Sequence, residues 1–120
     1  MENIAPDIYR QRLLIEGFYT IELSRDKVEE FLLSLAEALG LRTYGTPVVY
    51  SPGAGEGSEI NQGFDAFVPL IDSGISAYVW TGGKFFSILI YSCKSFDNAA
   101  AIEFTRDCLK AQDRPVSMSF

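Results

Sequence analysis

Asp72 and Ser73 place a carboxylate and a hydroxyl at the head of an apolar run, IDSGISAYVW. The pair is ordinary for a turn, and it is also an arrangement in which a serine hydroxyl could attack the carbonyl before it. Cys93 follows twenty residues after Ser73, at the end of a second apolar run. The sequence TGGK lies between the two runs and is typical of a β-hairpin turn. We therefore expect a hydroxyl and a thiol to meet at the open end of one hairpin.

The length of the hairpin loop sets which residues face each other. A three-residue loop over 82–84 places Ser73 opposite Cys93, and a two-residue loop places it opposite Ser92. In either register the Cβ atoms of Ser73 and Cys93 lie within about 5–8 Å. A plainer interpretation stays open, in which Ser73 is a turn residue and Cys93 a small buried apolar side chain.

Composition narrows the function classes. The chain has 120 residues and a net charge of −6, so we expect one domain over 1–120, no nucleic-acid partner and a preference for a small cationic ligand. It contains no histidine, which excludes Ser-His and Cys-His catalysis within one chain. The sequence has no apolar run of about 18 residues and no secretory leader, so we expect a cytoplasmic protein without membrane spans. Its two cysteines do not have a spacing typical of metal sites, so we expect no bound metal.

Strand-like and helix-like patterns along the chain predict the elements that position this hairpin. The expected order is β-α-β-β-β-β-α-β, an α+β fold built as a two-layer sandwich with a mainly antiparallel sheet and two helices on one face. The strands are expected over 12–23, 46–50, 64–71, 74–80, 85–93 and RPVSMSF, and the helices over 25–39 and from a cap at Ser95 or Asp97.

The strand over 74–80 carries large side chains on both faces. Ile75, Ala77 and Val79 alternate on one face, and Tyr78 and Trp80 occupy the other. Both faces therefore need cover, and we expect a homodimer that packs sheet on sheet. The first helix should bury Phe31, Leu32 and Leu35.

A polar loop runs from Ser51 to Gly63, SPGAGEGSEINQG. Its glycines do not have the G-x-G-x-x-G spacing, so phosphate binding is a weak interpretation. We expect a lid that lies over or beside the site.

The segment IDSGISAYVWTGGKFFSILIYSCK resembles the core of bacterial and archaeal S-adenosylmethionine decarboxylases. There the segment is roughly E-S-H-x-S-x-H-T-W-P-E, followed by a strand that ends in T-C-G. The match has no gap, and it aligns Ser73 with the serine that becomes a pyruvoyl group and Cys93 with the catalytic acid. Ser76 and Trp80 fall on the second serine and the tryptophan. Upstream, YSPG resembles F-x-P-x-G and places Tyr50 at the aromatic position, about ten residues being inserted after it.

The resemblance implies a chemistry for these residue types. In that family the serine hydroxyl attacks the preceding carbonyl, and β-elimination then splits the chain and leaves a pyruvoyl cofactor, here from Ser73. Its ketone is the electron sink for loss of CO₂ from S-adenosylmethionine, a step of spermidine and polyamine biosynthesis, and Cys93 would return a proton to the substrate. Tyr50, Tyr78 and Trp80 are candidates to contact the ligand, with core packing as the alternative for each.

This chain departs from the pattern where the family processes itself. Asp72 replaces a glutamate, and Gly74 replaces one histidine. Tyr78 replaces the histidine associated with elimination, and a phenol is a poor base at neutral pH. Asp65 falls where the family has a serine that assists processing.

Two hypotheses follow. The first is an unprocessed homologue that keeps the fold, and with it the ligand pocket, without forming a pyruvoyl group. The second is an active pyruvoyl-dependent decarboxylase of S-adenosylmethionine or a related amino acid, in which Asp65 or Tyr78 assists processing. The absent histidines favour the first.

Overall fold

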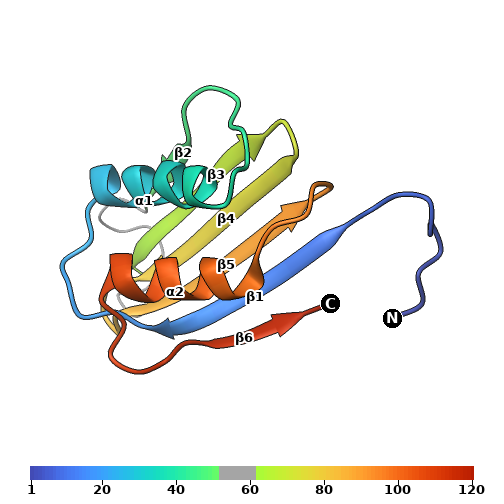
Figure 1. The fold of residues 1–120 in the computed structure, drawn as a ribbon. Helices are drawn as coiled ribbons and strands as arrows, with labels where there is room; N and C mark the ends of the chain where they lie inside the picture. Colours follow the sequence, from blue (N-terminus) through green and yellow to red (C-terminus); the bar gives the residue numbers. More distant parts are fainter. Residues whose placement is uncertain (52–61) are drawn as a thin grey trace.

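A computed structural model describes residues 1–51 and 62–120 of the chain (Figure 1). Six strands form one antiparallel sheet in the order β2-β3-β4-β5-β1-β6, and both helices cover the same face of it (Figure 1). The elements along the chain are β1 (Gln11–Phe18), α1 (Arg25–Ala38), β2 (Val48–Tyr50), β3 (Gly63–Leu70), β4 (Ser73–Trp80), β5 (Phe85–Ser92), α2 (Asn98–Leu109) and β6 (Val116–Ser119). The expected α+β fold and element order are confirmed.

Local sequence signals account for both helices. The Ser24 hydroxyl caps α1 by accepting a hydrogen bond from the Lys27 amide at 3.2 Å. The Asp97 carboxylate caps α2 in the same way through the Ala100 amide. Helix α1 buries Phe31, Leu32 and Leu35, as its periodicity predicted.

The first strand is shorter than expected. The prediction of a strand over 12–23 was too long, since β1 ends at Phe18. The Tyr19 amide then donates to the Lys84 carbonyl at 2.8 Å, and the chain leaves the sheet to reach the Ser24 cap. Ile21 and Leu23 pack partly buried against the core instead of pairing in the sheet. The β-propensity of the residues over 12–23 therefore did not indicate where β1 leaves the sheet.

The sheet has one buried face and one uncovered face. Inward-facing side chains under the helices are almost completely buried, among them Leu13, Ile15, Ile75, Ala77, Ile88 and Ile90. The alternate residues of the same strands point to the other side, where large side chains remain exposed, among them Phe18, Phe67, Tyr78, Tyr91, Val116 and Met118. The alternation expected along β4 is therefore confirmed.

Most of the Ser51–Gly63 segment lies outside the described residues, and the expectation of a lid there stays a prediction. Across residues 1–51 and 62–120, neither helix has the length and hydropathy needed to cross a membrane.

Candidate functional site

The β4–β5 hairpin brings Ser73 and Cys93 together. Strands pair with Trp80 opposite Phe85 and Ser73 opposite Ser92, which is the register expected for a two-residue loop. The Ser73 hydroxyl lies 3.8 Å from the Cys93 sulfur, within hydrogen-bonding reach of it. The predicted meeting of hydroxyl and thiol at the open end of the hairpin is confirmed.

Cys93 donates twice to the carbonyl between Asp72 and Ser73. Its oxygen accepts a hydrogen bond from the Cys93 amide at 2.8 Å and a second from the Cys93 thiol at 3.4 Å. Two donors on one carbonyl oxygen draw electrons from its carbon, which is the atom that a Ser73 hydroxyl would attack. Ser73 has a φ of 134°, a conformation that costs free energy in a residue with a side chain. Strain and a polarised carbonyl thus coincide at one peptide bond.

Arg42 anchors the acidic member of the pair. Its guanidinium lies 3.2 Å from one Asp72 carboxylate oxygen, and its amide donates to the other at 3.4 Å. The side-chain hydrogen bond from Arg42 is the main reason that the pKa of Asp72 lies below its usual value, against the opposing effect of burial. Nothing in the sequence pattern identified Arg42, because the contact spans thirty positions.

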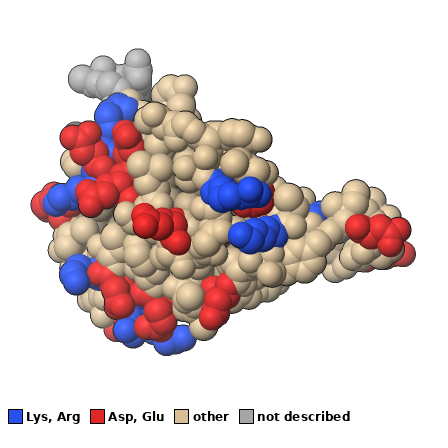
Figure 2. Space-filling model, turned by 45° about the horizontal axis from the view of Figure 1, so that its top comes forward, with Lys and Arg blue, Asp and Glu red and all other residues tan. Residues whose placement is uncertain are grey.

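Two cationic side chains, Arg42 and Lys94, lie near Asp72 at this end of the hairpin. Arg42 contacts Asp72, and the Lys94 ammonium donates to the Gly40 carbonyl at 3.0 Å and also favours the ionised form of Asp72. The expectation of a cationic ligand came from the net charge of the whole chain, −6. Figure 2 shows acidic and basic side chains interspersed over one face of the molecule. The net charge therefore does not describe the surroundings of Ser73.

Tyr78 and Asp65 lie apart from Ser73 and Cys93. Tyr78 is five positions along β4 from Ser73, or about 16 Å at the usual rise of a strand. It is exposed on the uncovered face, directly opposite Asp65 on β3. Within a single chain Tyr78 is therefore separated from Ser73 and Cys93, and its role as a site residue stays a prediction.

A polar row crosses the uncovered face instead. Tyr50, Asp65, Tyr78, Ser87 and Glu16 are successive partners across β2, β3, β4, β5 and β1. The Ser87 hydroxyl donates to the Glu16 carboxylate at 2.7 Å. Sequence reasoning missed Glu16 and Ser87, although their polar character at alternate positions of apolar strands was a signal.

A hollow of about 250 Å³ on the uncovered face includes Ser73 in its lining. The other lining residues are Phe67, Gly74, Ser76, Leu89 and Tyr91. Of the aromatic residues expected to contact a ligand, Tyr50 and Trp80 do not line this hollow, and the Trp80 ring packs on Phe85 with centroids 5.3 Å apart. Phe67 and Tyr91 take their place.

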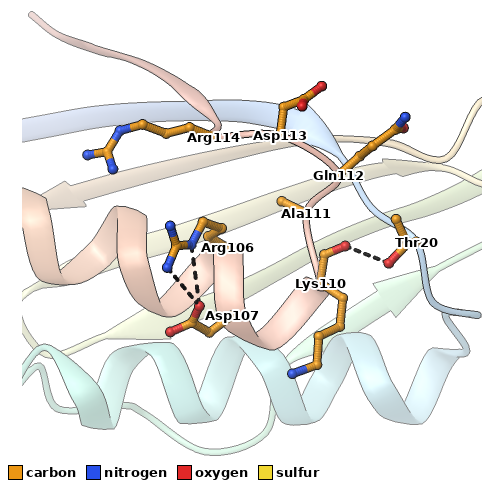
Figure 3. A pocket seen from close by; sticks show the side chains of 8 residues that line it. All are labelled: Thr20, Arg106, Asp107, Lys110, Ala111, Gln112, Asp113 and Arg114. Carbon is orange, nitrogen blue, oxygen red and sulfur yellow. Dashed lines mark hydrogen bonds and ion pairs between the residues drawn. The ribbon is translucent and has the colours of Figure 1, made fainter.

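A wider hollow of about 400 Å³ lies at the C-terminal end of α2 (Figure 3). There the Thr20 hydroxyl donates to the Lys110 carbonyl, and Arg106 pairs with the Asp107 carboxylate (Figure 3). Arg114 pairs with Glu103 at 3.1 Å. Because both arginines of the lining pair with carboxylates of the same chain, we assign no ligand to this hollow. In the described part of the chain, no group of three or more potential ligand side chains is placed to hold a metal ion.

Comparison with known proteins concerns the family and the fold of the chain. A family model described as S-adenosylmethionine decarboxylase matches residues 19–119. The crystal structure of the adenosylmethionine decarboxylase from Aquifex aeolicus VF5 is similar, with a TM-score of 0.69 and 17% identity over 94% of this chain and 89% of that chain. That likeness concerns the fold, and no curated protein matches. Because the family model covers most of the chain, this protein belongs to the S-adenosylmethionine decarboxylase family.

Proposed function

We propose that this chain is an unprocessed member of the family, which keeps the fold and a ligand pocket beside Ser73 without making a pyruvoyl group. The supporting observation is that neither Asp72 nor Tyr78 is a suitable base for Ser73. Elimination needs a group that removes the Cα proton of Ser73. The nearby carboxylate, Asp72, is bound by Arg42 and has a lowered pKa, which makes it a weaker base. Tyr78 lies five positions further along β4 than Ser73, on the uncovered face.

The intact mass of the purified chain tests this proposal. We expect one species of 120 residues. Cleavage before Ser73 would give fragments 1–72 and 73–120, of 72 and 48 residues. Their appearance in the wild type, and their absence in Ser73→Ala, would overturn the proposal.

A second candidate function is the active, pyruvoyl-dependent decarboxylase. The strained Ser73 and the two donors on the Asp72 carbonyl favour it, because both ease attack by the hydroxyl. A pyruvoyl group made from Ser73 would supply the electron sink for loss of CO₂, and the residues present fit it, since Cys93 adjoins Ser73 and would hold the proton that the substrate carbon receives. Asp65 or Tyr78 would then act on Ser73 from a second copy of the chain.

Release of labelled CO₂ from carboxyl-labelled S-adenosylmethionine tests the second candidate. Activity should accompany the two fragments and disappear in both Ser73→Ala and Cys93→Ala. An intact chain that releases no CO₂ excludes it and leaves the first proposal in place.

We also propose that the chain forms a cytoplasmic homodimer through the uncovered sheet face. Exposed apolar side chains from β1, β3, β5 and β6 share that face, and contiguous patches of this kind mark interaction sites. The ligand we propose is S-adenosylmethionine or its decarboxylated product. Sedimentation at micromolar concentration tests the dimer, and a compact monomer would contradict it.

A further inference from the structure

We propose that Arg12, together with Arg10 and the N-terminal segment over 1–10, forms a binding site for a small monocarboxylate. The N-terminal segment runs on from the start of β1 beyond the sheet and has no part in the proposed function (Figure 1). A hollow of about 240 Å³ lies there, and every residue that lines it belongs to 1–12. The inference goes beyond the proposed function and does not depend on it.

Arg12 carries a charge without a charged partner. It precedes the buried Leu13 on β1 and therefore lies on the uncovered face of the sheet. Its Nε atom is buried without a hydrogen-bond partner, and within residues 1–51 and 62–120 no carboxylate lies at ion-pair distance from its guanidinium. A guanidinium with an unpaired buried donor is poorly solvated, so it should bind an anion that reaches its other nitrogens from the hollow.

Neighbouring groups hold both guanidiniums in place. The Arg12 guanidinium carbon lies 5.3 Å from the centre of the Phe120 ring, a cation–π contact that orients the side chain without neutralising it. The Arg10 guanidinium donates to the Asn3 side-chain oxygen and, at 3.3 Å, to the Ala5 carbonyl. These two bonds tie the N-terminal segment to the start of β1. A second fixed cation thus lines the same hollow.

The charges of the lining indicate which anion fits. Its charged side chains are Arg10, Arg12 and Glu2. Two guanidiniums and one carboxylate leave one net positive charge, which suits a monoanion better than a doubly charged phosphate. The planar fork of an arginine also matches the two oxygens of a carboxylate. The volume of about 240 Å³ lies below the usual range for drug-sized ligands, about 300–1,000 Å³, so the ligand should be small.

Titration calorimetry with propionate tests the assignment. The buffer should have low ionic strength and contain no other carboxylate or phosphate, since salt screens a partly exposed site. The wild type should bind propionate saturably. Arg12→Gln should weaken binding about tenfold or more, the loss expected when a charge-assisted hydrogen bond is removed. Arg12→Lys should weaken it by a smaller factor, because an ammonium keeps the charge without the planar fork.

Two further variants and one spectrum complete the test. Arg114→Gln removes the same charge from the separate hollow at the end of α2 and should leave propionate binding unchanged. Arg10→Gln should weaken binding, and it decides the matter if Arg12→Gln does not fold. In NMR spectra of the wild type, the Nε–H signal of Arg12 should shift with propionate and saturate over the same concentrations as the heat.

The inference is overturned if propionate does not bind saturably, if Arg12→Gln binds it like the wild type, or if inorganic phosphate binds more tightly. A shift of Arg12→Gln from dimer to monomer in sedimentation would also overturn it, because the carboxylate at Arg12 would then belong to a second copy of the chain. None of these outcomes alters the intact mass, so failure of the proposed function is measured separately.

Discussion

The two faces of the sheet are built from the same strands and serve different purposes. On β5, Ile88 is fully buried under the helices, while the next residue, Leu89, lines the hollow beside Ser73 on the uncovered face. The covered face is a continuous apolar layer, whereas the other face mixes aromatic rings with a polar row from Asp65 to Glu16. The covered face forms the hydrophobic core, and the uncovered face is where we propose the ligand site and the dimer contact.

The largest expected effect comes from a cavity under the helices. Ile88→Ala should lower the free energy of unfolding by about 2–5 kcal/mol, because a fully buried side chain loses its contacts and leaves a void. Leu89→Ala, one position along and on the other face, should cost less than half as much. Urea denaturation of both variants measures the difference. Equal losses would mean that the uncovered face is packed as tightly as the core.

The next largest effect is expected on the proposed dimer, which uses only the uncovered face. Met118 pairs with Leu14 on the uncovered face and is 55% exposed. Met118→Asp should shift the protein to monomer at micromolar concentration, because an unpaired carboxylate would be buried against the second sheet. Leu33→Asp on α1, an exposed position of the helix layer, is the control and should leave the dimer intact. Sedimentation velocity distinguishes them, and a dimeric Met118→Asp would place the interface elsewhere.

A smaller effect is expected at Ser73. Its φ of 134° favours glycine, so Ser73→Gly should raise the free energy of unfolding by about 1 kcal/mol, whereas Ser73→Ala should not. Denaturant titration of the three proteins gives the answer. If the glycine and alanine variants were equally stable, the backbone at this bond would not be strained.

The smallest effect concerns pH and Arg42. The pKa of Asp72 is lower in the folded chain than in the unfolded chain, chiefly through the Arg42 hydrogen bond. Its contribution to stability is therefore complete above the unfolded pKa of about 3.9 and is lost as the pH falls through the lower, folded value. Arg42→Gln should flatten the loss of stability in this acid range. Arg106→Gln, which breaks exposed ion pairs, is the control and should leave the dependence of stability on pH unchanged. If Arg42→Gln also left it unchanged, Arg42 would not be the cause of the lowered pKa of Asp72.

Part of the site followed from short-range pattern alone. The glycine turn and two apolar runs were enough to bring Ser73 to Cys93, because strand pairing in a hairpin is set by counting from the loop. The same counting shows that Tyr78 lies well along β4 and on the uncovered face, but likeness to the family had grouped it with Ser73. Arg42 could not be found in this way, since its contact with Asp72 joins segments thirty positions apart.

The sequence by itself determined the fold class, the two helices with the Ser24 cap of the first, and the inward and outward faces of β4, while the cap of α2 was left open between Ser95 and Asp97. These follow from periodicity and from hydrogen bonds between close neighbours in the chain. Only the tertiary structure decided where β1 ends, which residues share the polar row, and that Phe67 lies over Gly74. The reason is physical: these contacts depend on strand order and on side-chain positions across different strands, and neither leaves a local mark in the sequence.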